Sequence, residues 1–220
     1  MQKSGGQVAT AGGERAPERR RGRPRAFDRE AALETATRLF WRKGYAATSV
    51  SDLTDAMGIG PPSLYAAFGS KEELYAEALR HYVQRYQGLV WDRFEAAPTA
   101  REAVSALLMD SAAALTGACG AGGPKGCMVT LSAVGCEGHA ELGERVRSAR
   151  ADGRARIEAR LARAVAEGEL PAGTDVPGLA RLVVAVQNGM SIQARDGASR
   201  DELEAVARNA LRAWQDDARG

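Results

Sequence analysis

The chain has 220 residues, of which 45% are hydrophobic and 26% are charged, and its formal net charge is +2. These values are typical of a soluble globular protein with one or two domains. No run approaches the ~18 apolar residues that a membrane-spanning helix needs, and the N-terminus lacks the apolar segment of a secretory signal. We therefore expect a cytoplasmic protein.

The positive charge is concentrated at the N-terminus, where residues 1–25 contain seven basic and two acidic side chains. Residues 1–18 show no hydrophobic periodicity and are expected to form a disordered tail. Residues 19–25, RRRGRPR, form a basic arm. Because clustered arginines neutralise phosphates, the arm is a candidate for contact with DNA. The alternative is a solvated tail whose charge is incidental.

The hydrophobic spacing predicts an all-α fold of about nine helices. Apolar residues recur at three- and four-residue steps, and no segment sustains an alternation with a period of two. The first helix is expected to begin at Asp28, a good N-cap, and to end at Gly44.

The next two helices are predicted to form a helix-turn-helix. Thr48 is the expected N-cap of the second helix, Gly58 ends it, and the third helix begins near Gly60 or Pro61. Such a pair presents the N-terminal end of its second helix to base edges in a major groove. An ordinary helical hairpin is the alternative. The side chains expected to hold the pair at a steep angle are Val50, Leu53, Ile59, Leu64 and Phe68.

Capping boxes mark the start of three later helices. Ser70 with Glu73 opens a fourth helix that is expected to run to about residue 95. The other two boxes are Thr99 with Glu102, which opens a helix to about Thr116, and Ser199 with Glu202. The box at Ser199 opens the last helix, at 199–214, and the remaining helices are expected at residues 127–137, 140–168 and 176–195. The predicted domains are a tail (1–18), a DNA-binding unit including the arm (19–73), and a second helical domain (74–220).

The segment from Phe27 to Leu79 resembles the N-terminal domain of TetR/AcrR-type transcriptional repressors. The motifs that carry the resemblance are Gly44-Tyr45, the threonine at 48, and the run G-I-x-P-P-S-L-Y-x-x-F-x-S-K-E-E-L from Gly58. The resemblance implies a repressor, not an enzyme, that binds a palindromic operator in double-stranded DNA as a homodimer. It also implies release by a small molecule bound in the C-terminal domain.

The resemblance assigns DNA contacts to one compact set of residues. Thr48 would cap the second helix and meet a phosphate, Tyr65 would contact the phosphate backbone, and Lys71 would bind a phosphate. Few side chains remain to form hydrogen bonds with bases: Ser63 can form one, and its neighbours offer apolar contact to thymine methyls. The full set is Thr48, Gly60, Pro61, Pro62, Ser63, Tyr65, Ala66 and Lys71.

The arm could supply part of the missing recognition. Arg21-Gly22-Arg23-Pro24-Arg25 has the residue order of an AT-hook core, in which arginines enter a narrow A/T-rich minor groove. A general electrostatic clamp is the alternative for Arg21, Arg23 and Arg25. A chain that relied on the arm alone, without a ligand, would be an architectural binder of A/T-rich DNA.

The three cysteines, Cys119, Cys127 and Cys136, suit a reducing compartment. Within a helix at 127–137, Cys127 and Cys136 would lie on opposite sides, and we interpret both as small buried side chains. A cysteine-based repressor that senses oxidants or electrophiles is the alternative. No histidine has ligand-type spacing to a cysteine, so neither a metal nor a cofactor is expected. The glycine-rich loop at 117–126 lacks the GK[ST] of a phosphate-binding loop and is interpreted as a flexible gate or linker.

The C-terminal half is expected to supply dimerisation and ligand binding. The helices at about 176–195 and 199–214 are the candidate dimer interface, because the first is apolar and contains the small residues Ala185 and Gly189. The effector is expected to be a hydrophobic small molecule, since polar side chains are scarce in these helices. The candidate pocket residues are Tyr86, Trp91, Met109, Met128 and Gln187.

Overall fold

The computed structural model describes residues 27–86, 88–117 and 123–217. These residues form ten helices and no strand, so the fold is all-α as predicted. The helices are α1 (Arg29–Lys43), α2 (Val50–Met57), α3 (Pro61–Phe68), α4 (Lys71–Tyr86), α5 (Gly88–Ala96), α6 (Ala100–Leu115), α7 (Met128–Leu131), α8 (Ala140–Ala166), α9 (Val176–Arg195) and α10 (Arg200–Asp217).

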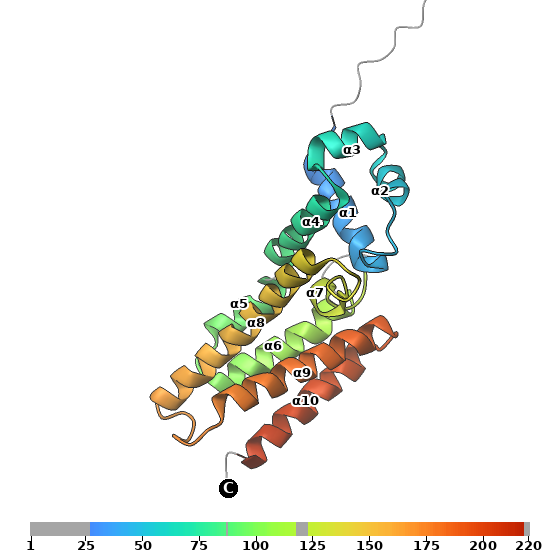
Figure 1. Ribbon diagram of the computed structural model, residues 1–220. Helices are drawn as coiled ribbons and strands as arrows, with labels where there is room; N and C mark the ends of the chain where they lie inside the picture. Colours follow the sequence, from blue (N-terminus) through green and yellow to red (C-terminus); the bar gives the residue numbers. More distant parts are fainter. Residues whose placement is uncertain (1–26, 87, 118–122, 218–220) are drawn as a thin grey trace, which may run out of the picture.

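The molecule is elongated, with two helical units joined by α4 (Figure 1). We call α1–α3 the head, and α5, α6, α8, α9 and α10 the bundle. Figure 1 shows α3 at the far end of the head, while α7 lies where the head meets the bundle. Within the described ranges, no helix combines the length and apolarity needed to cross a membrane.

Local capping signals explain the helix boundaries of the head. The Asp28 side chain accepts hydrogen bonds from the backbone amides of residues 30 and 31, and Gly44 ends α1, both as predicted. Gly58 ends α2 in the left-handed conformation (φ 67°), which glycine adopts without steric cost. The N-cap prediction for α2 was wrong. Ser49 caps the helix, because it forms a reciprocal capping box with Asp52.

The expected fourth helix is observed on both sides of residue 87, as α4 to Tyr86 and α5 from Gly88 to Ala96, and residue 87 lies outside the described residues. The structure differs from the predicted helices in one further place. The expected helix at 127–137 is only the single turn α7. Beyond it the chain turns so that Gly135 packs against Gly143 of α8; a Cβ on Gly135 would lie 2.9 Å from the Gly143 Cα. This close approach needs a turn where the sequence suggested a helix.

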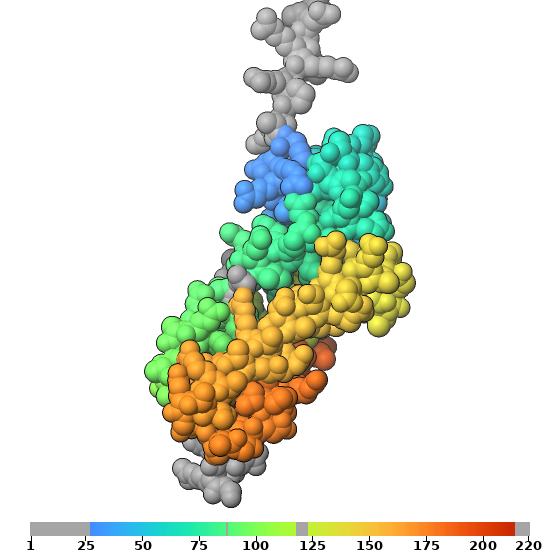
Figure 2. Space-filling view, turned by 60° about the vertical axis from the view of Figure 1, so that its left-hand side comes forward, coloured from blue at the N-terminus to red at the C-terminus, as the bar shows by residue number. Residues whose placement is uncertain are grey.

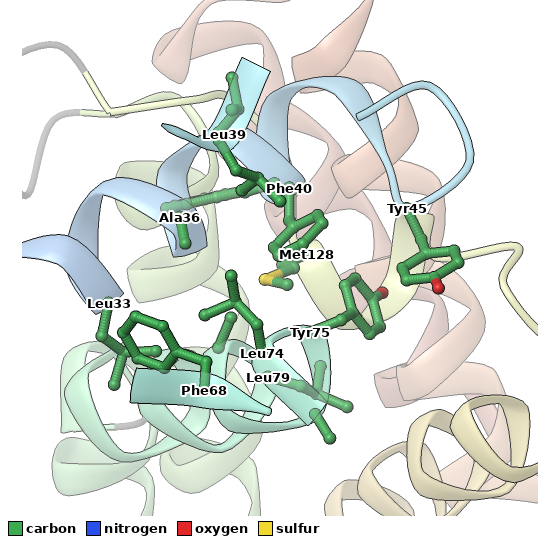
Figure 3. Close-up of a cluster of buried hydrophobic side chains, with 14 of the residues drawn as sticks. Leu33, Ala36, Leu39, Phe40, Tyr45, Phe68, Leu74, Tyr75, Leu79 and Met128 are labelled. Atoms are coloured by element: carbon green, nitrogen blue, oxygen red, sulfur yellow. The ribbon is translucent and has the colours of Figure 1, made fainter. Parts of the chain in front are cut away.

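The core of the head extends into the second half of the chain. Phe40, Leu53, Leu64, Leu74 and Tyr75 form its centre. The same cluster contains side chains from α7, α8 and the turn between them, namely Met128, Val134, Leu142 and Val146. Figure 3 shows Met128 projecting among the aromatic side chains of this core. The bundle has a separate core, so head and bundle meet through α4, α7 and the start of α8.

Candidate nucleic-acid interface and ligand cavity

The third helix divides its side chains between the core and an open surface. Leu64 and Phe68 are buried, as predicted from their spacing. Tyr65 is 48% exposed, and the other residues predicted to meet bases are exposed beside it: Pro61, Pro62, Ser63 and Ala66. The space-filling view places this surface at the end of the molecule, away from the bundle (Figure 2). The geometry therefore gathers the predicted recognition residues on one accessible face.

The start of α3 offers few hydrogen-bond donors to a ligand. Gly60 is the N-cap, and Pro61 and Pro62 have no amide hydrogen. The amide of Ser63 donates to the Gly60 carbonyl at 3.0 Å. Most helices present free amides at this position, whereas here the polar groups facing outward are the hydroxyls of Ser63 and Tyr65. A molecule at the start of α3 would therefore meet side chains rather than free backbone amides.

Arg29 fixes the position of α3, a role that the sequence reasoning missed. Its guanidinium donates two hydrogen bonds to Glu77 of α4, at 2.6 and 2.7 Å. Its Nε donates to the Ala67 carbonyl at 3.3 Å, and the guanidinium carbon lies 4.6 Å from the centre of the Phe68 ring. One side chain of α1 thus joins the end of α3 to α4.

Lys71 lies at the first turn of α4, with its ammonium 4.2 Å from the centre of the Tyr45 ring. The Tyr45 hydroxyl donates to Glu72 at 2.6 Å, and burial together with this bond raises the pKa of Tyr45. These contacts hold Lys71 beside the head, where a phosphate-binding lysine was expected.

Thr48 is completely buried, and its hydroxyl donates to the Gly44 carbonyl at 2.6 Å. Its observed role is to close the turn between α1 and α2. Arg21, Arg23 and Arg25 lie outside the described residues.

A cavity of about 260 Å³ lies at the junction of α1 with α4 to α9. Of the predicted pocket residues, Tyr86, Trp91 and Gln187 line it. The structure contradicts the other two placements. Met128 is buried in the core of the head, and Met109 packs against the core of the bundle. The misplacement of Met128 follows from α7, whose next residues, Val129 and Thr130, face the cavity instead.

Trp41 is the most informative lining residue, and it was missed. It belongs to α1, yet it is buried against the cavity wall, with its ring centre 4.9 Å from Tyr82 and 5.3 Å from Tyr86. Its indole nitrogen donates to the Gly126 carbonyl at 2.9 Å. Tyr86 adds a second link, because its hydroxyl donates to Glu34 of α1 at 3.3 Å. The head therefore contributes directly to the wall of the cavity.

Gly126 shows why the end of the glycine-rich loop has its sequence. Its φ is +77°, and a Cβ there would lie 2.6 Å from Leu131 and 2.9 Å from the carbonyl oxygen of Ser191. The Gly126 amide donates to the Leu115 carbonyl at 2.8 Å. The predicted gate is therefore held at this end by α6, α9 and Trp41. Residues 118–122 of the loop lie outside the described ranges.

A second contact joins α1 to α9. The guanidinium of Arg195 donates to the carbonyls of Trp41 and Arg42, at 2.8 and 3.0 Å. These carbonyls lie in the last turn of α1, where intrahelical donors are missing. Burial lowers the pKa of Arg195, and its Nε is buried without a partner among the described residues. Arg195 thus caps α1 from the last residue of α9.

The cysteines do not follow the prediction of two buried side chains on one helix. Cys127 is half-buried and lines the cavity, with its amide donating to the Ser191 hydroxyl at 2.8 Å. Cys136 is exposed in the turn after α7. Cys119 lies outside the described residues. No group of three or more potential metal ligands occurs in the part of the chain that the structure describes.

The outer face of α9 is apolar and open. Leu182 is 48% exposed and Ile192 is 52% exposed. They share one side of the helix with the exposed Ala185 and the half-buried Gly189, since positions 182, 185, 189 and 192 follow helical spacing. Other residues of α9, including Val183 and Met190, are buried in the bundle. The helix therefore has an apolar face left over after the bundle is packed.

Two family models match the chain. Residues 32–78 match "Bacterial regulatory proteins, tetR family", and residues 103–211 match "Tetracyclin repressor-like, C-terminal domain". The transcriptional repressor ComR of Escherichia coli (strain K12) is 36% identical over 197 residues, which cover 88% of this chain and 92% of ComR.

Solved structures agree with these matches. The TetR family regulator CifR, solved as a cysteine mutant in complex with a 26bp double-stranded operator DNA, is 42% identical, with a TM-score of 0.80. The match covers 87% of this chain and 99% of CifR. A putative TetR regulator from Rhodococcus sp. RHA1 is also 42% identical, with a TM-score of 0.55, over 84% of this chain and 97% of that one. These relatives are transcriptional regulators and not enzymes. The chain belongs to the TetR family of DNA-binding transcriptional regulators.

Proposed function

We propose that this protein is a homodimeric repressor that binds a palindromic operator and is released from it by a small molecule bound in the cavity. The observation that carries the proposal is the position of Trp41. This side chain belongs to α1 of the head and at the same time forms part of the cavity wall. A ligand in contact with Trp41 would act on the helix that holds the recognition helix in place.

The surface of α3 supports the DNA-binding part of the proposal. Ser63 and Ala66 would face bases, the prolines would contact thymine methyls, and Tyr65 would contact the phosphate backbone. Lys71 would bind a phosphate beside the head. CifR, which shares 42% of its sequence with this chain, was solved on its operator DNA. We extend that mode of binding to this protein.

The open face of α9 supports a dimer. Two copies of the face formed by Leu182, Ala185, Gly189 and Ile192 could pack against each other, together with α10, as a four-helix bundle. Small residues between the two large ones would let the helices approach closely. Because Arg195 connects α9 to the end of α1, such a dimer would set the separation of the two heads on a palindrome.

Ligand release would use the contacts between the cavity and α1. Trp41 and Tyr86 both line the cavity. Trp41 is itself a residue of α1, and Tyr86 is linked to α1 by its hydrogen bond to Glu34. Gly126 joins the same wall to α6 and α9. A ligand that binds the released state more tightly by a few kcal/mol is enough to change operator occupancy.

The arm would add a preference for A/T-rich flanks, since α3 has few base-reading groups. Replacing both Arg21 and Arg23 by Ala should reduce the discrimination between operators with A/T and with G/C flanks. Binding assays on the two DNA sets measure this directly. Unchanged discrimination would leave the arm with a general electrostatic role.

A second candidate function follows from Cys127, whose half-buried thiol lines the cavity. Oxidation or alkylation there would place a new group in the cavity and release DNA. Operator binding is measured with and without peroxide in the natural chain and in Cys127→Ser. Loss of binding only in the natural chain would support a sensor, and equal binding in all four samples would remove it.

The main proposal is tested by selecting bound sequences from random double-stranded DNA. We expect an inverted repeat, occupied by one dimer in analytical ultracentrifugation. A double variant, Leu182→Glu with Ile192→Glu, should be monomeric and should bind the repeat weakly, while Arg145→Glu, an exposed change on α8 outside the proposed dimer face, controls for charge. Enrichment of a single unpaired site, or no enrichment, would contradict the proposal.

A further inference from the structure

We propose that the cavity binds an uncharged aromatic molecule whose polar group both donates and accepts a hydrogen bond, as a carboxamide does. This inference rests on the proposed function, because it names the class of ligand for the same cavity. Three features of the wall support it. These are an aromatic side, a neutral polar side, and a rim whose three arginines, Arg150, Arg154 and Arg156, already have partners.

The aromatic side is formed by Trp41, Tyr82, Tyr86 and Trp91. The first three pack on one another, with ring centres 4.9 to 5.3 Å apart. Trp91 lies on α5 and its ring packs edge-on against Phe94. Rings of this kind favour a flat aromatic partner over an aliphatic one of equal size, because stacked and edge-on pairs add about 0.5–1.5 kcal/mol beyond area burial.

The neutral polar side lies on α9, where Gln187 and Asn188 both line the cavity. Gln187 uses its amide nitrogen to donate to the Ser111 hydroxyl at 2.8 Å, which leaves its amide oxygen as an acceptor. Asn188 uses its amide oxygen to accept from Thr130 at 3.1 Å, which leaves its amide nitrogen as a donor. A ligand group that donates to the first and accepts from the second would satisfy both.

The three arginines of the rim already have partners. Arg150 donates to backbone carbonyls of residues 129, 130 and 132. Arg154 pairs with Glu158, and Arg156 pairs with Glu95 at 3.3 Å. A carboxylate ligand would therefore share its cation with an existing partner, and would gain less from it than from an unpaired arginine.

The cavity therefore favours neither an anionic nor a cationic ligand. An anion would also meet the exposed carboxylate of Asp152 at the rim, and a cation would meet the three arginines. An ion held among the neutral side chains deeper in the wall would lose its hydration without compensation. The volume of about 260 Å³ far exceeds what a single water occupies, so an organic molecule fits.

The test uses the full chain and four probes of one shape: naphthalene carboxamide, naphthoate, naphthylmethylammonium and decalin carboxamide. Calorimetry without DNA measures their affinities. We expect the aromatic carboxamide to bind at least about tenfold more tightly than the anion and the cation, and several-fold more tightly than the decalin carboxamide. Equal or tighter binding of either ion, or no saturable binding by the aromatic carboxamide, would overturn the proposal.

Variants and a second readout locate the site and separate the two proposals. Gln187→Leu and Asn188→Leu, each checked by circular dichroism, should weaken the aromatic carboxamide about fivefold to tenfold. Unchanged affinity in both folded variants would overturn the assignment. Release of operator DNA is measured separately. If the carboxamide binds as expected while the operator stays bound, the ligand class is supported and the proposed release mechanism fails.

Discussion

The head and the cavity build their candidate binding surfaces in opposite ways. The head presents one short segment, residues 60–66 of α3 and its N-cap, on an open surface. The cavity draws its wall from α1 and from α4 to α9. In the proposed function, the surface that contacts DNA would therefore be encoded locally, whereas the surface that contacts the ligand would depend on tertiary packing. Trp41 belongs to both regions, and this overlap is what would let one affect the other.

The largest effect is expected from Trp41→Ala, which removes the side chain shared by the two regions. The free energy of unfolding should fall by about 3–5 kcal/mol, as for other buried aromatic truncations. Trp41→Phe keeps a ring but loses the bond to Gly126, so about 1 kcal/mol is expected. Denaturant unfolding monitored by circular dichroism measures both. A loss well below 1 kcal/mol in the alanine variant would show that the regions are not joined here.

A smaller loss is expected from Arg195→Ala, which removes the cap that α9 places on α1. Two carbonyls lose their donor, and the free energy of unfolding should fall by about 1–2 kcal/mol. Arg181→Ala removes the same charge from an exposed position on α9 and should change it by less than about 0.5 kcal/mol. Equal effects of the two variants would show that the contact with α1 adds no stability.

Lys71→Gln tests whether the lysine beside the head contacts a DNA phosphate. Removing one phosphate contact should weaken binding similarly for all operator sequences. It should also reduce the slope of log affinity against log salt by about 1. Lys125→Gln, at an exposed lysine of the loop before α7 and outside α1–α4, should leave the slope unchanged. If Lys71→Gln behaves like this control, Lys71 does not contact phosphate.

The smallest effect concerns acid stability of the head. The Ser49 amide, followed by Lys43, lowers the pKa of Asp52 from 3.8 to about 2. A lowered folded-state pKa means that the stabilisation is present above 3.8 and is lost as the pH falls toward 2. Asp52→Asn should remove this component. Urea midpoints of both proteins across that range measure it, and parallel curves would contradict the assignment.

The comparison also explains how far the sequence could predict the structure. Asp28, Gly44 and Gly58 bound their helices as predicted, because capping depends on a few adjacent residues. The N-cap predicted at Thr48 could also have been placed correctly from adjacent residues, because Ser49 is followed at the third helical position by Asp52, which completes a capping box. The exposure of Tyr65 and the burial of Leu64 followed from helical spacing alone.

The cavity could be predicted only in part. Tyr86, Trp91 and Gln187 were found because they are large or polar side chains on the correct helices. Trp41 was missed because its burial depends on α4 and on Gly126, which is 85 residues away along the chain. Met128 was misplaced because α7 is too short for its orientation to follow from periodicity.

The central claim is that filling the cavity releases the operator, and Gly153 of α8 tests it without a known ligand. Gly153 lines the cavity, and a Cβ there would lie 3.6 Å from the Trp91 ring, in ordinary contact. Gly153→Leu would place a side chain in the cavity, while Gly153→Ala adds only the Cβ and is the matched control. Operator affinity is measured for both on the selected inverted repeat.

Gly153→Leu should bind the operator about tenfold more weakly than Gly153→Ala, which corresponds to about 1.4 kcal/mol, with both proteins folded and equally dimeric. Equal operator affinity of two folded, dimeric variants would contradict the claim that the cavity controls the head.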